Sequence, residues 1–158
     1  MHRTLRDLRV VGACALTVLS LSACGARTVA VDDYWIAGGD KDYCEKLVSE
    51  LPGEVATPGR RVVEPTASHI EKYSAVWGSP VITLRCGESA PAGFVPEDGD
   101  ILVNGITWSP QKLTHGYRFY CKSIAMPLSV TVPSEYAPET GALADIAETL
   151  GHYVVIEP

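Results

Sequence analysis

Apolar side chains recur at helical spacing in three segments: residues 40–51, residues 68–77 and the stretch after Pro138. In the first segment, positions i, i+3, i+4 and i+7 are apolar: Cys44, Leu47, Val48 and Leu51. This spacing places them on one face of a helix, which Pro52-Gly53 ends. We therefore predict three helices, each packed through one apolar face.

Period-two alternation of apolar and polar residues predicts strands in much of the remaining chain. The segments are 81–86, 100–103, 106–108, 117–121, 128–132 and 153–156. Asn104-Gly105 separates two of them and is the strongest short signal for a hairpin. Hairpin-linked strands and separate helices together predict an α+β fold. We expect a single small domain with a mostly antiparallel sheet and two to three packed helices.

The first residues have the layout of an export signal, because Arg3, Arg6 and Arg9 precede an apolar run over residues 10–21. The run is shorter than the roughly 20 apolar residues that a bilayer-spanning helix needs. It ends in a sequence that resembles a bacterial lipoprotein lipobox: Leu21-Ser22-Ala23-Cys24-Gly25.

The lipobox resemblance implies a diacylglyceryl group on the Cys24 sulfur and cleavage before this residue. Residues 1–23 would then be a signal peptide, 24–39 a tether and 40–158 the globular domain. The protein would be anchored by lipid at the extracytoplasmic face of the cell membrane. Ordinary secretion, with Cys24 a bystander near the cleavage site, is the alternative.

Charge narrows the classes of partner. The chain has 13 basic and 19 acidic residues, and without residues 1–23 the formal charge falls to −8, from 10 basic and 18 acidic residues. Such an acidic body lacks the electrostatic footprint of a nucleic-acid-binding protein. Anionic lipid headgroups would also repel it unless a tether held it there.

Three cysteines remain in the expected mature body, so at most one intramolecular disulfide forms. Cys44 lies on the apolar face of the first predicted helix, and Cys86 lies on the apolar side of the strand 81–86. Both therefore face inward, and we predict that they form a disulfide, as an oxidising compartment favours. Pairings that involve Cys121 stay open.

Several motifs, taken in order, resemble the DUF3515 family of exported proteins and lipoproteins of actinobacteria, whose function is unknown. These are Trp77-Gly78-Ser79-Pro80, Leu84-Arg85-Cys86-Gly87 and Val103-Asn104-Gly105-Ile106-Thr107-Trp108. The helix around Cys44 and the pair Arg60-Arg61 also match. The resemblance implies an extracytoplasmic location and adds support for the Cys44–Cys86 pair, but it implies no reaction, cofactor or substrate.

Candidate chemistry is sparse. His69, His115 and His152 are interpreted as exposed turn and helix-end residues, and no GxSxG, SxxK or Cys-His motif accompanies them. A dyad of Cys121 with a histidine is the catalytic alternative. The acidic clusters do not continue into a calcium-binding loop, and no CxxC or CxxH spacing indicates zinc. We expect neither a metal nor a cofactor.

Arg60, Arg61, Arg85 and Trp108 are the candidate ligand-binding residues. A planar guanidinium near tryptophans could hold an anion or a peptide, because it binds carboxylates through two hydrogen bonds. The alternative is that Arg85 points outward and pairs with a surface acid, while the tryptophans fill the core.

The sequence therefore predicts a lipid-anchored envelope protein that binds another envelope protein or a cell-wall ligand without catalysis. A small envelope hydrolase and a structural spacer are the alternatives. A deep cleft that a histidine lines, with a carboxylate or thiol in reach, would favour the hydrolase. A body without any concave or apolar surface patch would favour the spacer.

Overall fold

The computed structural model describes residues 28–154, and within them seven strands form one antiparallel sheet. The strand order across the sheet is β1-β2-β3-β7-β6-β5-β4. The strands are β1 (Arg60–Arg61), β2 (Ser74–Trp77), β3 (Ile82–Cys86), β4 (Ile101–Val103), β5 (Ile106–Leu113), β6 (Gly116–Cys121) and β7 (Leu128–Val132). The last strand in sequence thus lies in the middle of the sheet, between β3 and β6.

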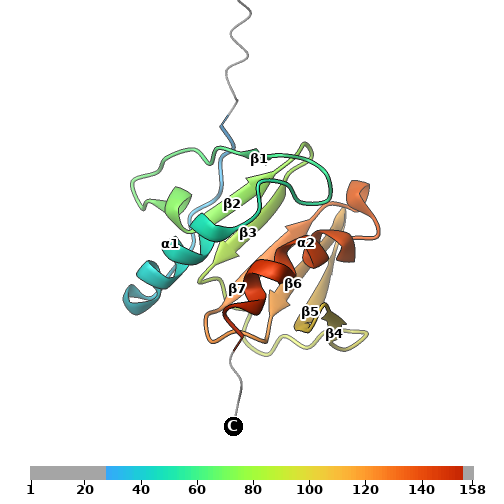
Figure 1. The fold of residues 1–158 in the computed structure, drawn as a ribbon. Helices are drawn as coiled ribbons and strands as arrows, with labels where there is room; N and C mark the ends of the chain where they lie inside the picture. Colours follow the sequence, from blue (N-terminus) through green and yellow to red (C-terminus); the bar gives the residue numbers. More distant parts are fainter. Residues whose placement is uncertain (1–27, 155–158) are drawn as a thin grey trace, which may run out of the picture.

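Two α-helices, α1 (Lys41–Glu50) and α2 (Thr140–Gly151), lie on the same side of the sheet (Figure 1). Short 3-10 helices occupy η1 (Gly38–Asp40), η2 (Ile70–Lys72) and η3 (Ser134–Tyr136). The α-helices bury their apolar faces against the sheet, as the fully buried Leu47 of α1 and Leu143 of α2 show. No helix among residues 28–154 is both long and apolar enough to cross a membrane.

Register divides the sheet into two chemically different faces. Leu84 of β3 pairs with Val130 of β7, and Val130 pairs with Phe119 of β6. Apolar side chains therefore line the side of the sheet that faces the helices. We call this side the helix face. The neighbouring residues point the other way, and Arg85 pairs there with Ser129 of β7. We call that side the polar face.

Most predicted elements are confirmed. Helices at α1 and α2, the strands β3, β6 and β7, and the Asn104-Gly105 hairpin between β4 and β5 all form. Asn104 and Gly105 both have positive φ, as the tight turn requires. The final predicted strand is represented by a single bridge between Val154 and Ile124, and residues 155–156 lie outside the described range.

The predicted helix over residues 68–77 is wrong, so the fold has two α-helices. Thr66 accepts a hydrogen bond from the backbone N–H of Ile70, but only the 3-10 turn η2 follows. His69 has a left-handed backbone at φ 60°, which no helix interior accepts. The chain then extends into β2, whose four residues are all buried because both faces of this strand are covered.

The polar face is partly covered by residues 28–36, which we call the N-terminal strap. Val29 forms a parallel bridge with Val63, and Val31 and Ile36 are buried. Part of the expected tether 24–39 therefore packs on the body, whereas Trp35 within it is 81% exposed. The expected signal peptide 1–23 and the expected lipid site Cys24 lie outside the described residues.

Candidate functional site

The four residues expected to bind a ligand do not form one site. Strand register places Arg60 and Trp108 on the helix face, and Arg61 and Arg85 on the polar face. Arg61 lies on β1, which is two strands from β3, so it is not adjacent to Arg85. Only Arg85 stands among other charged groups on a sheet face that no helix covers.

Arg60 holds the end of α1 against the sheet. Its Nη2 donates to the Val48 carbonyl at 2.8 Å and its Nη1 to the Leu51 carbonyl at 3.2 Å. These carbonyls belong to the last helical turn, which leaves them without partners inside the helix. The guanidinium also lies over the ring of Trp77 at 5.9 Å, and burial lowers its pKa. Arg60 is thus committed to helix capping.

Trp108 and Arg61 lie on opposite faces of the sheet. Trp108 is fully buried beneath the helices, opposite Cys121 in the β5–β6 register. Arg61 Nη1 donates to the carbonyl of Gly78 at 3.0 Å, at the turn after β2. Neither side chain contributes to the charged cluster around Arg85.

Arg85 and Arg118 share one carboxylate on the polar face, that of Glu88. Arg85 Nη1 donates to Glu88 Oε1 at 3.1 Å, and Arg118 Nη1 lies 3.6 Å from the same oxygen. The buried hydroxyl of Ser129 donates to Glu88 Oε2. Arg118 is oriented by Thr131, whose hydroxyl accepts from Nε at 3.1 Å. Among these residues, two cations surround one anion.

The strap completes the cluster from the other side. Arg85 lies over the ring of Tyr34 with its Cζ 5.7 Å from the ring centre. Its Nη2 lies 4.0 Å from Asp32, whose side chain is fully exposed. The Arg85 side chain itself is 15% exposed, and its buried Nε has no hydrogen-bond partner within residues 28–154.

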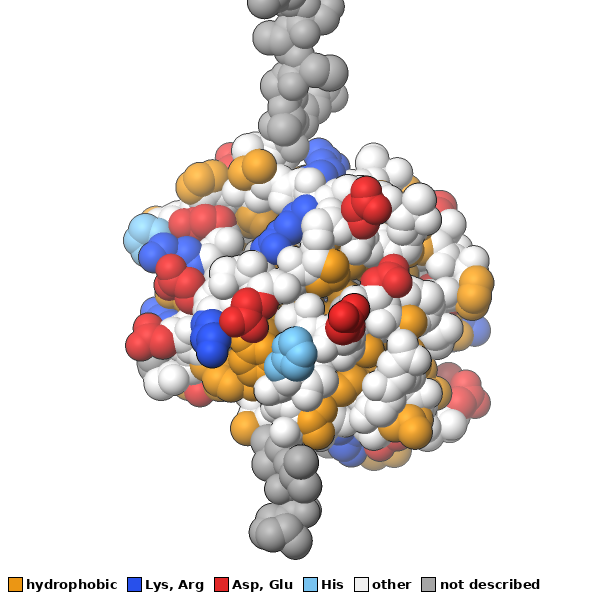
Figure 2. Space-filling view, viewed as in Figure 1, with side chains coloured by type: hydrophobic (Ala, Val, Ile, Leu, Met, Phe, Trp, Pro, Cys, Tyr) orange, Lys and Arg blue, Asp and Glu red, His pale blue; other side chains and the backbone are white. Residues whose placement is uncertain are grey.

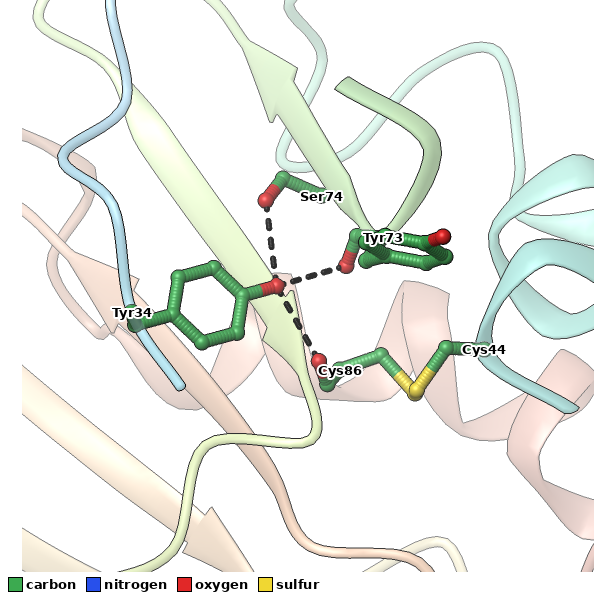
Figure 3. The surroundings of a disulfide bond; sticks show 5 residues. All are labelled: Tyr34, Cys44, Tyr73, Ser74 and Cys86. Atoms are coloured by element: carbon green, nitrogen blue, oxygen red, sulfur yellow. Dashed lines mark hydrogen bonds between the residues drawn. A yellow bond between two sulfur atoms is a disulfide. The ribbon is translucent and has the colours of Figure 1, made fainter. Parts of the chain in front are cut away.

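Tyr34 also joins the strap to the end of the sheet beside the disulfide (Figure 3). Its hydroxyl lies 3.0 Å from the carbonyls of both Tyr73 and Cys86 and 3.2 Å from the hydroxyl of Ser74. Burial raises the pKa of Tyr34 to about 12, although the Ser74 hydrogen bond opposes this. Tyr34 therefore stays neutral and holds the strap beside Arg85.

The predicted disulfide between Cys44 and Cys86 is confirmed, with the two Cα atoms 5.5 Å apart. It joins α1 to the end of β3 on the helix face, the opposite side of this strand from Tyr34 (Figure 3). Cys121 is free and half-buried, and burial raises the pKa of its thiol.

Sequence reasoning missed Asp32, Tyr34, Glu88, Arg118 and Ser129 as partners of Arg85. The alternation in 117–121 does put Arg118 on the outward side, as in β3 for Arg85. The local sequence does not indicate that β7 lies between β3 and β6. This strand order brings the guanidinium groups of Arg85 and Arg118 to one carboxylate.

A model of the family described as "Protein of unknown function (DUF3515)" matches residues 8–157. The chain belongs to the DUF3515 family. No curated protein and no solved structure matches it. The description of the DUF3515 family names no activity.

The features that would mark a hydrolase do not come together in the described part of this DUF3515 protein. His69 Nδ1 lies 3.3 Å from Glu71 Oε1, but the histidine is exposed on a turn. Four hollows of about 260 to 680 Å³ are lined by described residues, and no histidine lines any of the four. Residues 28–154 also hold no group of three or more potential ligands placed for a metal ion.

Concave surface is present on this DUF3515 protein, which is the feature a spacer would lack. A hollow of about 290 Å³ adjoins the charged cluster and is lined in part by Glu88, Phe94, Tyr120 and Lys122. The side of the molecule that carries the helices shows acidic and basic side chains scattered among apolar ones (Figure 2).

Proposed function

We propose that this protein is fastened to the outer face of the cell membrane by lipid on Cys24 and acts there as a non-catalytic binding protein. Its recognition surface is the polar face around Arg85, Glu88 and Arg118. The partner is another envelope protein or a cell-wall ligand.

The observation that carries the binding role is the charged cluster itself. Half-buried arginines are costly to keep in a sheet unless anions offset their charge. Arg60, by contrast, is satisfied by two backbone carbonyls. Arg85 and Arg118 instead surround a single carboxylate and keep part of their hydrogen-bonding capacity.

The order of the chain supports a recognition surface near the membrane. Residue 28, where the strap begins, is four residues from Cys24, a distance of at most about 14 Å in extended chain. The strap crosses the polar face, so an anchored Cys24 would keep this face within a short reach of the bilayer. Acyl chains would supply the affinity for lipid that an acidic body lacks.

The test is photo-crosslinking in intact cells followed by membrane fractionation. A benzophenone amino acid is placed at Thr83, which lies on the polar face, or at Glu148, which is exposed on α2. We expect a reproducible partner from Thr83 and none from Glu148. Cys24→Ser should release the protein from membranes and abolish the capture.

Equal capture from both positions would overturn the recognition surface. Retention of Cys24→Ser with membranes, still carrying lipid, would overturn the anchor.

A further inference from the structure

The guanidinium of Arg85 has two edges that can each bind a carboxylate. Its planar N–H groups point outward in fixed directions, so each edge offers two parallel donors. Nη1 is engaged by Glu88 at 3.1 Å, which fixes the plane of the group. Nε and Nη2 together form the side-on edge, which faces away from that contact.

The side-on edge is poorly satisfied by the protein. Nε is buried and has no acceptor within the described chain, and Nη2 reaches only the exposed carboxylate of Asp32 at 4.0 Å. An ion pair of this length on an exposed side chain contributes little. A buried N–H without an acceptor is unfavourable, so an oxygen brought to this edge would gain more than one bound at the surface.

Charge selects the kind of anion. Arg85 and Arg118 are offset by Glu88 and, at 4.0 Å, by the exposed Asp32, so a monoanion that replaces Asp32 keeps the cluster neutral. A phosphate dianion would leave excess negative charge on a protein whose formal charge is already −6. A carboxylate also presents two oxygens in the plane that the two parallel N–H groups require.

We propose that the side-on edge of Arg85 binds a carboxylate group of the ligand, in competition with Asp32 of the strap. This inference rests on the proposed function and names the ligand chemistry of the same surface. Asp32 occupies the edge weakly and swings away when the ligand arrives, while Tyr34 and Glu88 hold the guanidinium in place.

Nuclear magnetic resonance of the Arg85 Nε–H group tests the proposal directly. The full-length, ¹⁵N-labelled protein in nonionic detergent is titrated with N-acetylglycine, which carries a free carboxylate, or with N-acetylglycinamide, which does not. We expect a saturable downfield shift of the Arg85 Nε–H resonance with the acid only. Inorganic phosphate at equal ionic strength should bind more weakly.

Two neighbouring aspartates provide a matched control. Asp32→Asn removes the competing carboxylate, and binding of the acid should become about two- to fivefold tighter. Asp33→Asn removes the same charge one residue away, where Asp33 accepts a hydrogen bond from Ser68 and does not contact Arg85. The affinity of Asp33→Asn for N-acetylglycine should equal that of the unmodified protein within experimental error.

An equal response to acid and amide, tighter binding of phosphate, or equal gains from both aspartate variants would each overturn the carboxylate site. A silent Arg85 resonance in a protein that still captures a partner through Thr83 overturns this inference and leaves the proposed function standing. A responding resonance without capture in cells overturns the proposed function and leaves the carboxylate site standing.

Discussion

The hydroxyl of Tyr34 is the point where three separate segments of the chain meet. It has one proton to donate, and the Tyr73 and Cys86 carbonyls are both acceptors within reach, while Ser74 can donate to its oxygen. The group is enclosed by protein, so ionisation would place a charge in a poorly solvated position. This explains why the pKa of Tyr34 is raised to about 12.

We predict that Tyr34 contributes stability below pH 10 and loses this contribution between pH 10 and 12. A raised pKa in the folded state means that the folded protein keeps the proton longer than the unfolded chain, so stability falls as pH rises. A rise in the pKa from 10 to about 12 corresponds to at most about 3 kcal/mol. Tyr34→Phe should be about 1–3 kcal/mol less stable at pH 8, because buried partners lose the hydroxyl.

The measurement is the free energy of unfolding in urea from pH 8 to 12 for both proteins. The difference between them should shrink as Tyr34 ionises. Tyr153, whose pKa is also raised to about 12, is present in both and cancels from the comparison. A difference that stays constant to pH 12 would contradict the assignment.

At the scale of elements, the sequence pattern predicted those helices, strands and turns whose formation depends on nearby residues. The apolar stripe of α1, the alternation of β3 and the turn at Asn104 were each readable because propensity, burial and turn chemistry agree there. The prediction of a helix over residues 74–77 was wrong because this strand is buried on both sides and its sequence therefore shows no alternation of apolar and polar residues. A short apolar run of this kind is equally compatible with a buried helix.

The candidate site was predictable only in part, for a related reason. Arg85 was found because its place in the alternation of 81–86 is local. Glu88 and Arg118 were missed because their meeting depends on β7 entering the middle of the sheet. Tyr34 of the strap contacts residues that are distant in sequence, Tyr73 and Cys86. The spacing of neighbouring residues cannot predict such contacts.

Two hairpin glycines should respond very differently to a methyl group. Gly105 has φ 83° with nothing within 4 Å of an added Cβ, so Gly105→Ala should cost only the left-handed strain, about 1–2 kcal/mol. Gly116 has φ 109°, and its Cβ would lie 2.8 Å from Ser134 N and still closer to Val132 O. Strain plus overpacking against this backbone should make Gly116→Ala cost about 3 kcal/mol or more.

Urea unfolding midpoints, compared at unchanged m-value, measure both glycine variants. Equal losses of stability in the two variants would show that the backbone at the end of β7 moves aside easily, which would contradict tight packing at Gly116.

At the scale of the whole molecule, one covalent bond fastens the first helix to the sheet. Cys44 and Cys86 are 42 residues apart in sequence, and the chain between them includes most of α1 together with β1, β2 and nearly all of β3. The strap runs directly into η1 and α1, so the disulfide also limits how far the strap can leave the polar face. The bond therefore links the stability of the domain to the geometry around Arg85.

Removing this bond should lower the free energy of unfolding by roughly 4 kcal/mol on the chain-entropy model. The double variant Cys44→Ala/Cys86→Ala is compared with Cys121→Ala, which removes a half-buried free thiol instead. Urea unfolding with and without dithiothreitol should show a large loss on reduction of the unmodified protein and of Cys121→Ala. The double variant should have the lower free energy of unfolding already without dithiothreitol. The reductant should not change this value, because the variant has no disulfide to reduce. If reduction leaves the unmodified protein unchanged, α1 is held to the sheet by packing alone.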